Sequence, residues 1–361
     1  MAQYTTLTDD GRTGAGNRLY EILGVLGVYV LGAVLFGLGC LISGEFLTPQ
    51  NLMNTLQAVT LLGIVSVGVA FITYSQHYVD LSIPGIMALA GIVAVSALKY
   101  GFAASMAAGM ATGLAIGLIN GCVIGYLRLN PIIWTLAMMS VLSGVIRKAY
   151  AGKQVYPDIA TAAGKAFLDL YHVEVAGLVP LPVAILIVLA VAGYFVMRKT
   201  CFGAQLKVTG SSYEVARMTG VNVRRVVLWA FVISAATSAI AGILLTSFNK
   251  VGAMYIGKGY DFAAITAVVI GGMTLAGGRG NIIGVLGGVM VIALMNNVTG
   301  LVRIEDLRLR ADLGLLGLSY VLRIQDFTFS EFHKAIIQGI VFILVVGASS
   351  YSRRKSGLDD A

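Results

Sequence analysis

Long apolar stretches alternate with short polar ones along almost the whole chain. A helix crosses a hydrocarbon core about 30 Å thick with roughly 20 apolar residues. The pattern therefore predicts an all-α, polytopic membrane protein with about ten transmembrane helices, or nine to eleven if short neighbouring runs merge or dip. The predicted spans are 20–43, 53–75, 82–99, 103–127, 131–149, 178–197, 223–248, 260–277, 280–302 and 334–352.

The composition supports this interpretation and leaves no room for a soluble domain. Of the 361 residues, 58% are hydrophobic and 12% are charged, and the mean hydropathy is +0.87. Charged residues fall almost wholly between the predicted spans. We therefore expect a single transmembrane domain, residues 20–352, between a polar tail at 1–19 and a second tail at 353–361.

The distribution of Lys and Arg predicts the orientation, because basic residues in short loops resist translocation. The densest basic block, 198–225, is therefore placed in the cytoplasm. With ten spans, this assignment also places both termini in the cytoplasm and the segments 150–177 and 303–333 in the periplasm. The formal net charge of +8 mostly reflects topology, and nothing in it indicates nucleic-acid binding.

Within the basic block the sequence predicts a short surface helix of about two turns. Ser211 and Glu214 fit a capping box, in which the serine hydroxyl accepts a hydrogen bond from the amide of the glutamate. Gly220 suits the left-handed position that follows a helix. This cytoplasmic helix is where the chain can engage a partner outside the membrane.

Glycine shapes the predicted bundle in two places. The span 103–127 carries a glycine at every fourth position from Gly109 to Gly125, a spacing that lets helix backbones approach closely. Packing is the main interpretation of this ridge, and a wall of a translocation path is the alternative. Near the other end, Ala276–Asn281 predicts a tight cytoplasmic turn; it lacks the Lys-Ser/Thr of a phosphate-binding loop, so we expect no ATP binding there.

Polar residues in or beside spans are the candidates for a substrate pathway. Charged or amide side chains are costly in hydrocarbon, so each invites either a functional role or a local structural one such as helix capping. The candidates are Asp80, Ser82, Asn120, Asn130 and Asn297. Ser82 and Asn130 are also expected to cap the helices that follow them, and Asp261 is a weaker candidate for the pathway.

Catalytic chemistry is poorly supported. The sequence has no nucleophile elbow, no metal-binding pair of histidines on a helix and no paired carboxylates inside a span. The three cysteines are far apart, which gives no disulfide or metal pattern. We therefore expect a non-catalytic protein that binds no metal.

Four stretches together resemble a known family. They are Val79–Ser82, Gly117–Gly121 continuing into Leu127–Pro131, Phe202-Gly203 followed by Glu214–Gly220, and Asp261–Gly280 continuing to Asn296-Asn297. In this order they resemble the permease subunits of bacterial ABC importers for simple sugars, the ribose, galactose, xylose and autoinducer-2 group, which is related to branched-chain amino acid permeases.

The resemblance implies that this chain is one subunit of a transporter with several subunits in the bacterial inner membrane. Two permease chains would line one pathway for a monosaccharide or sugar-like polyol, and a periplasmic sugar-binding protein would deliver the substrate. A pair of ATPase subunits would bind ATP and Mg, and this chain would hold no cofactor. The segment that the resemblance assigns to ATPase coupling comprises Ser211, Glu214, Ala216, Arg217, Met218 and Gly220.

The chain departs from the family pattern in two places. Tyr78 and Pro84 replace the usual glycines around Asp80, and the segment 303–333 is longer than expected. These differences can change which sugar passes or which binding protein docks.

Two alternative functions stay open. An autonomous proton-coupled secondary transporter would need a relay of ionisable residues within the membrane, and this chain has few. A structural or signalling membrane protein without a solute path would use the cytoplasmic helix for another partner.

Overall fold

Helices dominate the computed structural model, which describes residues 14–76, 79–175, 177–301, 303–304, 307–313, 318–324, 327–328, 336–337, 339–341, 343 and 347. Among the described residues, the helices with defined bounds are α1 (Gly14–Ile42), α2 (Pro49–Tyr74), α3 (Ile83–Ala97), α4 (Phe102–Leu127), α5 (Pro131–Tyr150), α6 (Ala162–Asp169), α7 (Leu181–Lys199), α8 (Cys201–Ser211), α9 (Tyr213–Met218), α10 (Val223–Asn249), α11 (Tyr260–Ile270) and α12 (Ile282–Leu301). A 3₁₀ turn, η1 (Leu98–Tyr100), extends α3. The predicted all-α membrane architecture is confirmed.

Nine of the ten predicted spans fall on helices in the described part of the chain. Seven of these helices are long and apolar enough to cross a membrane, and two shorter apolar helices, Leu26–Ile42 within α1 and α11, accompany them. Helix α11 ends at Ile270 because two glycines follow, so the span predicted to reach residue 277 is too long. The tenth predicted span, 334–352, lies mostly outside the described residues, and the total of ten stays a prediction.

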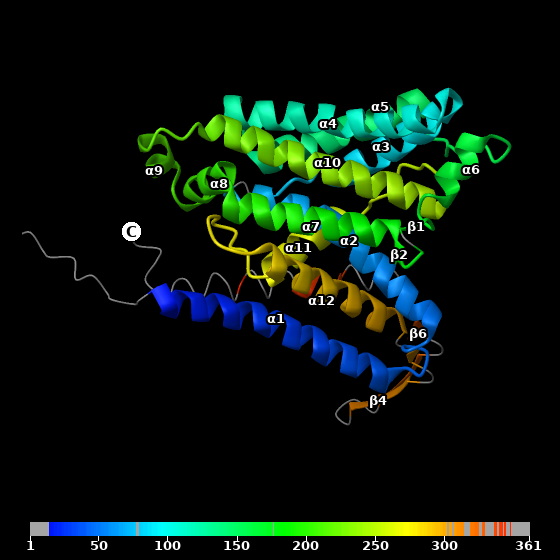
Figure 1. Ribbon diagram of the computed structural model, residues 1–361. Helices are drawn as coiled ribbons and strands as arrows, with labels where there is room; N and C mark the ends of the chain where they lie inside the picture. The colour runs from blue at the N-terminus through cyan, green and yellow to red at the C-terminus, as the bar shows by residue number, and fades with distance from the viewer. Residues whose placement is uncertain are drawn as a thin grey trace, which may run out of the picture.

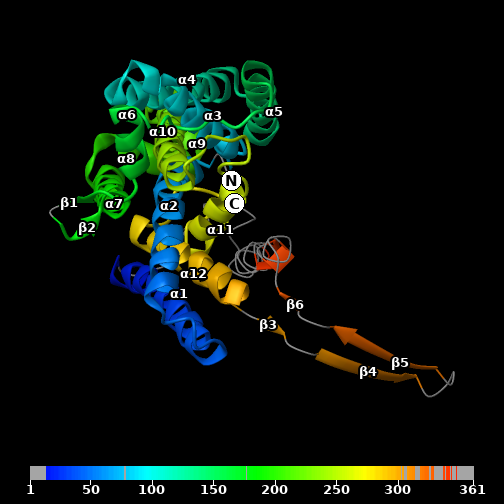
Figure 2. The same ribbon diagram turned by 90° about the vertical axis from the view of Figure 1, so that its right-hand side faces the viewer.

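Helix α2 lies at the centre of the bundle. All residues of its C-terminal part, Thr60–Tyr74, are buried. It packs against α10 on one side, α11 and α12 on the other, and α7 along its flank (Figures 1 and 2). Helices α3 and α4 cover α10, α5 packs on α3 and α4, and α1 packs against α12 on the side of the bundle away from them. This central position explains why the buried part of α2 is mainly apolar on all sides.

The glycine ridge of α4 serves helix packing. A Cβ at Gly113 or Gly117 would press on Ala235 of α10, and one at Gly121 would lie 2.7 Å from the carbonyl oxygen of Leu228. Small residues on both helices therefore bring the two backbones together. The packing interpretation of the ridge holds in this chain, since the ridge faces α10.

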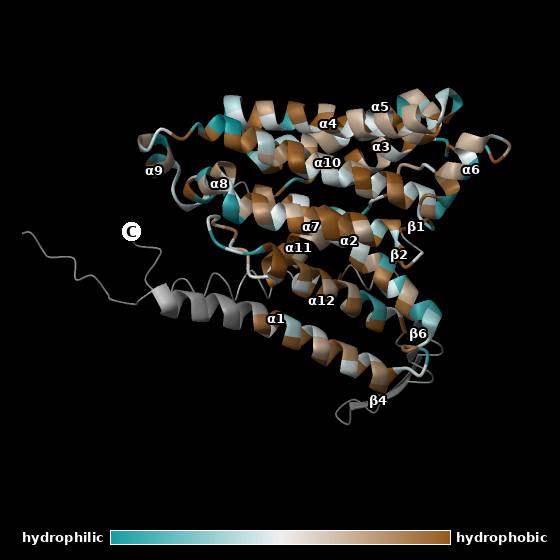
Figure 3. Ribbon diagram, in the orientation of Figure 1, coloured by the Kyte–Doolittle hydropathy of each residue, from teal (hydrophilic) through white to brown (hydrophobic). Residues whose placement is uncertain are grey.

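The bundle has two polar ends and an apolar middle (Figure 3). One end, here called the α9 end, carries α8, α9, the start of α10 and the last turns of α4 and α7 (Figure 1). The other, called the α6 end, carries α6 and the two-residue strands β1 (Glu174–Val175) and β2 (Val179–Pro180). The loop between α11 and α12 reverses the chain at the α9 end, as the glycine-rich sequence predicts.

Short strands occur after α12, where the sequence analysis expected none. Strand β4 (Leu307–Leu313) pairs with β5 (Leu318–Ile324) in an antiparallel arrangement, and β3 (Arg303–Ile304) pairs with β6 (Phe327–Thr328) between these two strands and the helical bundle (Figure 2). The signal is present in the sequence: Leu307–Leu313 alternates apolar and polar residues with the period of a strand. The remainder of the predicted outer segment 303–333 lies outside the described residues.

Candidate functional site

Helix α9 is present where the sequence predicts a short surface helix, but its cap is a different serine. Ser212 is the N-cap, and its hydroxyl accepts a hydrogen bond from the Val215 amide. Ser211 is the last residue of α8, and its hydroxyl donates to the carbonyl of Lys207 in the same helix. The capping box assigned to Ser211 is therefore wrong by one residue, because α8 extends further than the sequence indicates.

One face of α9 is open to the surroundings. Met218 is 84% exposed and Val215 is 51% exposed, and the charged side chains of Glu214 and Arg217 are exposed as well. Ala216 is fully buried and faces the bundle. Large apolar side chains standing out of a polar end are the kind of surface that partner proteins cover. Val215 belongs to this surface and was not among the predicted coupling residues.

The chain turns sharply after α9. Gly220 has φ +78°, the left-handed conformation that the sequence predicts for it. The amide of Val221 then donates to the carbonyl of Ala216, which closes the turn, and Asn222 caps α10. Only four residues thus separate α9 from the long buried helix α10.

A junction of backbone segments holds the base of α9 against the bundle. The amide of Gly278, in the loop between α11 and α12, donates to the carbonyl of Tyr74 at the end of α2. Gly210, two residues before the α9 cap, packs directly on both groups, and Gly277 packs on Gly210. Any side chain at Gly210 would collide with backbone atoms. Helices α2 and α8 and the α11–α12 loop therefore meet without intervening side chains, directly before α9 begins.

A buried polar cluster lies at the break between α2 and α3. Ser82 donates to Asp80 Oδ1 through both its backbone amide and its hydroxyl. The side-chain amide of Asn120, from α4, donates to the Ser82 hydroxyl at 2.9 Å, and the Trp134 indole, from α5, donates to Asn120 Oδ1 at 2.9 Å. Asp80, Ser82 and Asn120 have no exposed surface. Asp80 Oδ2 accepts no hydrogen bond from the described residues.

This cluster corrects the predicted role of Ser82. It stands at the N-cap of α3, but its side chain makes no capping hydrogen bond and serves the cluster instead. Trp134 and Thr135, whose hydroxyl accepts from the Leu81 amide, complete the arrangement and were missed by the sequence analysis. Their place in the sequence could have indicated this role. Both lie in the first turns of α5, which begins beside the end of α4, the helix that carries Asn120.

The other two pathway candidates lie apart from this cluster. Asn130 caps α5, as predicted, by accepting from the amides of Ile132 and Ile133. Asn297 forms a reciprocal pair of amide hydrogen bonds with Asn51, at 2.7 and 3.1 Å, between the end of α12 and the start of α2. The structure thus brings together Asp80, Ser82 and Asn120, and it separates Asn297 from them. In the described part of the chain, no three His, Cys, Asp or Glu residues cluster in a way that could hold a metal ion.

The geometry describes a helical bundle with a short exposed helix at one end, and the sequence matches known proteins over most of its length. The family model described as the permease component of the branched-chain amino acid transport system matches residues 51–346. The L-arabinose transport system permease protein of Escherichia coli is 32% identical over 84% of this chain and 90% of its own length. The ribose import permease protein of Bacillus subtilis is 30% identical over 89% of this chain and 90% of its own length. The L-arabinose ABC transporter permease protein of Azospirillum brasilense is 31% identical over 79% of this chain and 83% of its own. A capped, exposed helix at one end of an apolar bundle and a match over most of the chain lead to one conclusion: this protein belongs to the family of ABC transporter permease components.

Proposed function

We propose that this chain is the permease subunit of an ABC importer that moves a monosaccharide or sugar-like polyol across the bacterial inner membrane. The similarity to arabinose and ribose permeases along most of the chain carries the proposal. The chain itself is not an enzyme; a separate ATPase subunit binds ATP and Mg and hydrolyses the nucleotide. A periplasmic binding protein delivers the sugar, and a second permease chain completes the pathway.

The exposed face of α9 is the proposed ATPase docking surface, defined as Glu214, Val215, Arg217 and Met218. It combines two apolar side chains with one charge of each sign, and a protein groove with an apolar floor and a polar rim would match it. The other predicted coupling residues act within the permease. Ala216 packs α9 on the bundle, Gly220 permits the turn into α10, and Ser211 ends α8.

The docking role gives the orientation of the protein. If the ATPase binds α9, the α9 end faces the cytoplasm and the α6 end faces the periplasm. The described N-terminal end of α1 lies toward the α9 end (Figure 1), which agrees with a cytoplasmic N-terminus. With a tenth span, the C-terminus would also be cytoplasmic.

The cluster of Asp80, Ser82 and Asn120 is the proposed border of the sugar pathway. Sugars carry many hydroxyl donors, and Asp80 Oδ2 is a buried acceptor without a hydrogen-bond partner among the described residues. When the pathway opens, this oxygen would accept a hydrogen bond from a hydroxyl group of the passing sugar. Asn130 and Asn297 do not line this border. Asn130 caps α5, and Asn297 joins α12 to α2 through its hydrogen bonds with Asn51.

Purification and uptake measurements test the proposal. The wild-type chain should copurify in detergent with an ATPase subunit, and uptake of the sugar should require nucleotide hydrolysis. Met218→Glu or Arg217→Glu should weaken the recovery of the ATPase about tenfold or more, since exposed interface anchors of this kind contribute on the order of 2 kcal/mol. Lys165→Glu, the same charge change on exposed α6 at the opposite end, is the control and should leave recovery unchanged.

Two results would contradict the proposal. Normal uptake by Met218→Glu and Arg217→Glu would exclude α9 as the docking surface. Concentrative, proton-driven uptake by the purified chain alone in liposomes would instead establish the secondary transporter.

A further inference from the structure

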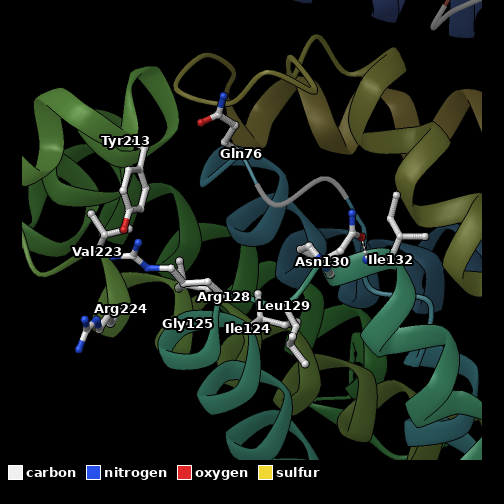
Figure 4. A pocket seen from close by; sticks show the side chains of 12 residues that line it. Gln76, Ile124, Gly125, Arg128, Leu129, Asn130, Ile132, Tyr213, Val223 and Arg224 are labelled. Atoms are coloured by element: carbon white, nitrogen blue, oxygen red, sulfur yellow. Dashed lines mark hydrogen bonds between the residues drawn. The ribbon is translucent and has the colours of Figure 1, made fainter.

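The corner between α4 and α5 faces α9 across a pocket of about 470 Å³. Its walls come from Gln76, two residues after α2, the α4–α5 corner, the first residue of α9 and the start of α10 (Figure 4). A pocket at this place leaves the corner and α9 without close packing between them. A side chain that reaches across the pocket therefore sets their separation.

Arg128 is that side chain. Its guanidinium carbon lies 5.4 Å from the centroid of the Tyr213 ring, within the range of a cation–π contact. Figure 4 shows the two side chains extended toward one another from opposite walls. Arg224 also lines the pocket, but its guanidinium carbon lies 6.0 Å from the centroid of the Tyr126 ring. Figure 4 shows the Arg224 side chain pointing away from Tyr213. Arg128 is thus the link between the α4–α5 corner and the first residue of α9.

The backbone at Arg128 favours a different residue. It has φ +56° and ψ +34°, the left-handed conformation in which α4 ends. Glycine adopts this conformation more readily, because it has no Cβ to clash with the neighbouring carbonyl. An arginine at this place is therefore explained by its side chain and not by the turn.

The same corner also holds the buried polar cluster. Asn130 and Pro131 begin α5, and Trp134 and Thr135 in its first turns bond to Asn120 and to the Leu81 amide. Asn120 lies on α4 two turns before Arg128. A shift of the corner relative to α3 therefore has to stretch the hydrogen bonds that surround Asp80.

We propose that Arg128 is a positioning residue that transmits the position of the coupling helix α9, through Tyr213 and the α4–α5 corner, to the cluster around Asp80. The proposal rests on the docking role of α9 and adds the route inside the permease. When the ATPase moves α9, the Arg128–Tyr213 contact moves or releases the corner. The corner then changes the hydrogen bonds of Trp134 and Asn120, and with them access to Asp80.

The decisive variant is Arg128→Gly in the complete importer. Glycine suits the backbone, so the permease should assemble and retain its ATPase as the wild type does. Uptake per ATP hydrolysed should fall about two- to fivefold, the factor that corresponds to loss of an exposed cation–π contact. Lys250→Gly is the matched control, because Lys250 ends α10 at the α6 end with φ +58°. It makes the same backbone change away from α9 and should leave the uptake per ATP unchanged.

Variants of Tyr213, the aromatic partner of Arg128, supply the second part of the experiment. Tyr213→Phe keeps an aromatic face and should retain coupling, whereas Tyr213→Leu should lower it to the level of Arg128→Gly. The double variant Arg128→Gly/Tyr213→Leu should be no worse than either single variant, since both remove one contact. Normal coupling in Arg128→Gly, or additive losses in the double variant, would overturn the proposal.

These outcomes are separate from those of the docking test. If α9 does not dock the ATPase, Met218→Glu and Arg217→Glu leave ATPase recovery intact. If docking is right and the route is wrong, those two variants lose the ATPase while Arg128→Gly transports normally.

Discussion

The approach of α4 to α10 at Gly121 offers a direct test of the packing. A Cβ built on Gly121 would lie 2.7 Å from the carbonyl oxygen, 2.8 Å from the Cα and 3.1 Å from the carbonyl carbon of Leu228. All three are backbone atoms of a long helix, so no side chain can rotate away to make room. Gly121→Ala therefore has to push the two helices apart.

The sign of the stability change is decided by two opposing effects. Alanine in place of glycine favours a helix by about 0.5–1 kcal/mol. Overpacking a close contact costs about 1–3 kcal/mol, and backbone atoms give the upper part of that range. Gly121→Ala should therefore lower the free energy of unfolding by roughly 1–2 kcal/mol.

Two glycines supply the matched controls. A Cβ at Gly37 on α1 or at Gly144 on α5 would meet nothing within 4 Å. Because only the helix propensity acts at these positions, both alanine variants should be neutral or slightly more stable. The assay is thermal unfolding of the purified permease in one detergent, followed by intrinsic fluorescence. Gly121→Ala should lower Tm by a few degrees. A Tm at or above that of the two controls would show that α4 and α10 are not in backbone contact.

Three further outcomes follow from the hydrogen bonds. Ser212→Ala should destabilise α9 by about 1 kcal/mol and speed amide exchange there, whereas Ser211→Ala should not; the reverse order would restore the predicted capping box. Asn51→Leu should lower Tm through the unpaired amide left on Asn297, and the double variant Asn51→Leu/Asn297→Leu should recover part of the loss; additive losses would mean that the pair is not formed. Asp80→Asn keeps the acceptor that Ser82 uses but replaces Oδ2 by an NH2 donor. Uptake should therefore fall, and the uptake that continues should stay independent of a proton gradient. Complete loss of a proton-driven flux would favour the secondary transporter instead.

The sequence by itself determined the class of the protein and most of its helix positions. Apolar runs of about 20 residues can satisfy their backbone groups in lipid only as helices. Hydropathy alone therefore predicts spans such as 103–127 and 223–248, which the structure has as Phe102–Leu127 and Val223–Asn249. Local chemistry also predicted the Asn130 cap and the left-handed Gly220, because both depend only on residues next to them in the chain. The glycine spacing of α4 predicted close packing without naming the partner helix.

Only the tertiary structure decided which polar residues act together. The cluster of Asp80, Ser82, Asn120 and Trp134 draws on three segments of the chain, and no local pattern ranks Trp134 above other aromatic residues or removes Asn297 from the set. The cap of α9 moved from Ser211 to Ser212 because α8 continues to the junction with Gly278, a contact between residues far apart in sequence. Helix formation is set by neighbours along the chain and by the surrounding lipid. Hydrogen-bond partners inside the bundle depend on how the helices pack, and packing is a property of the whole fold.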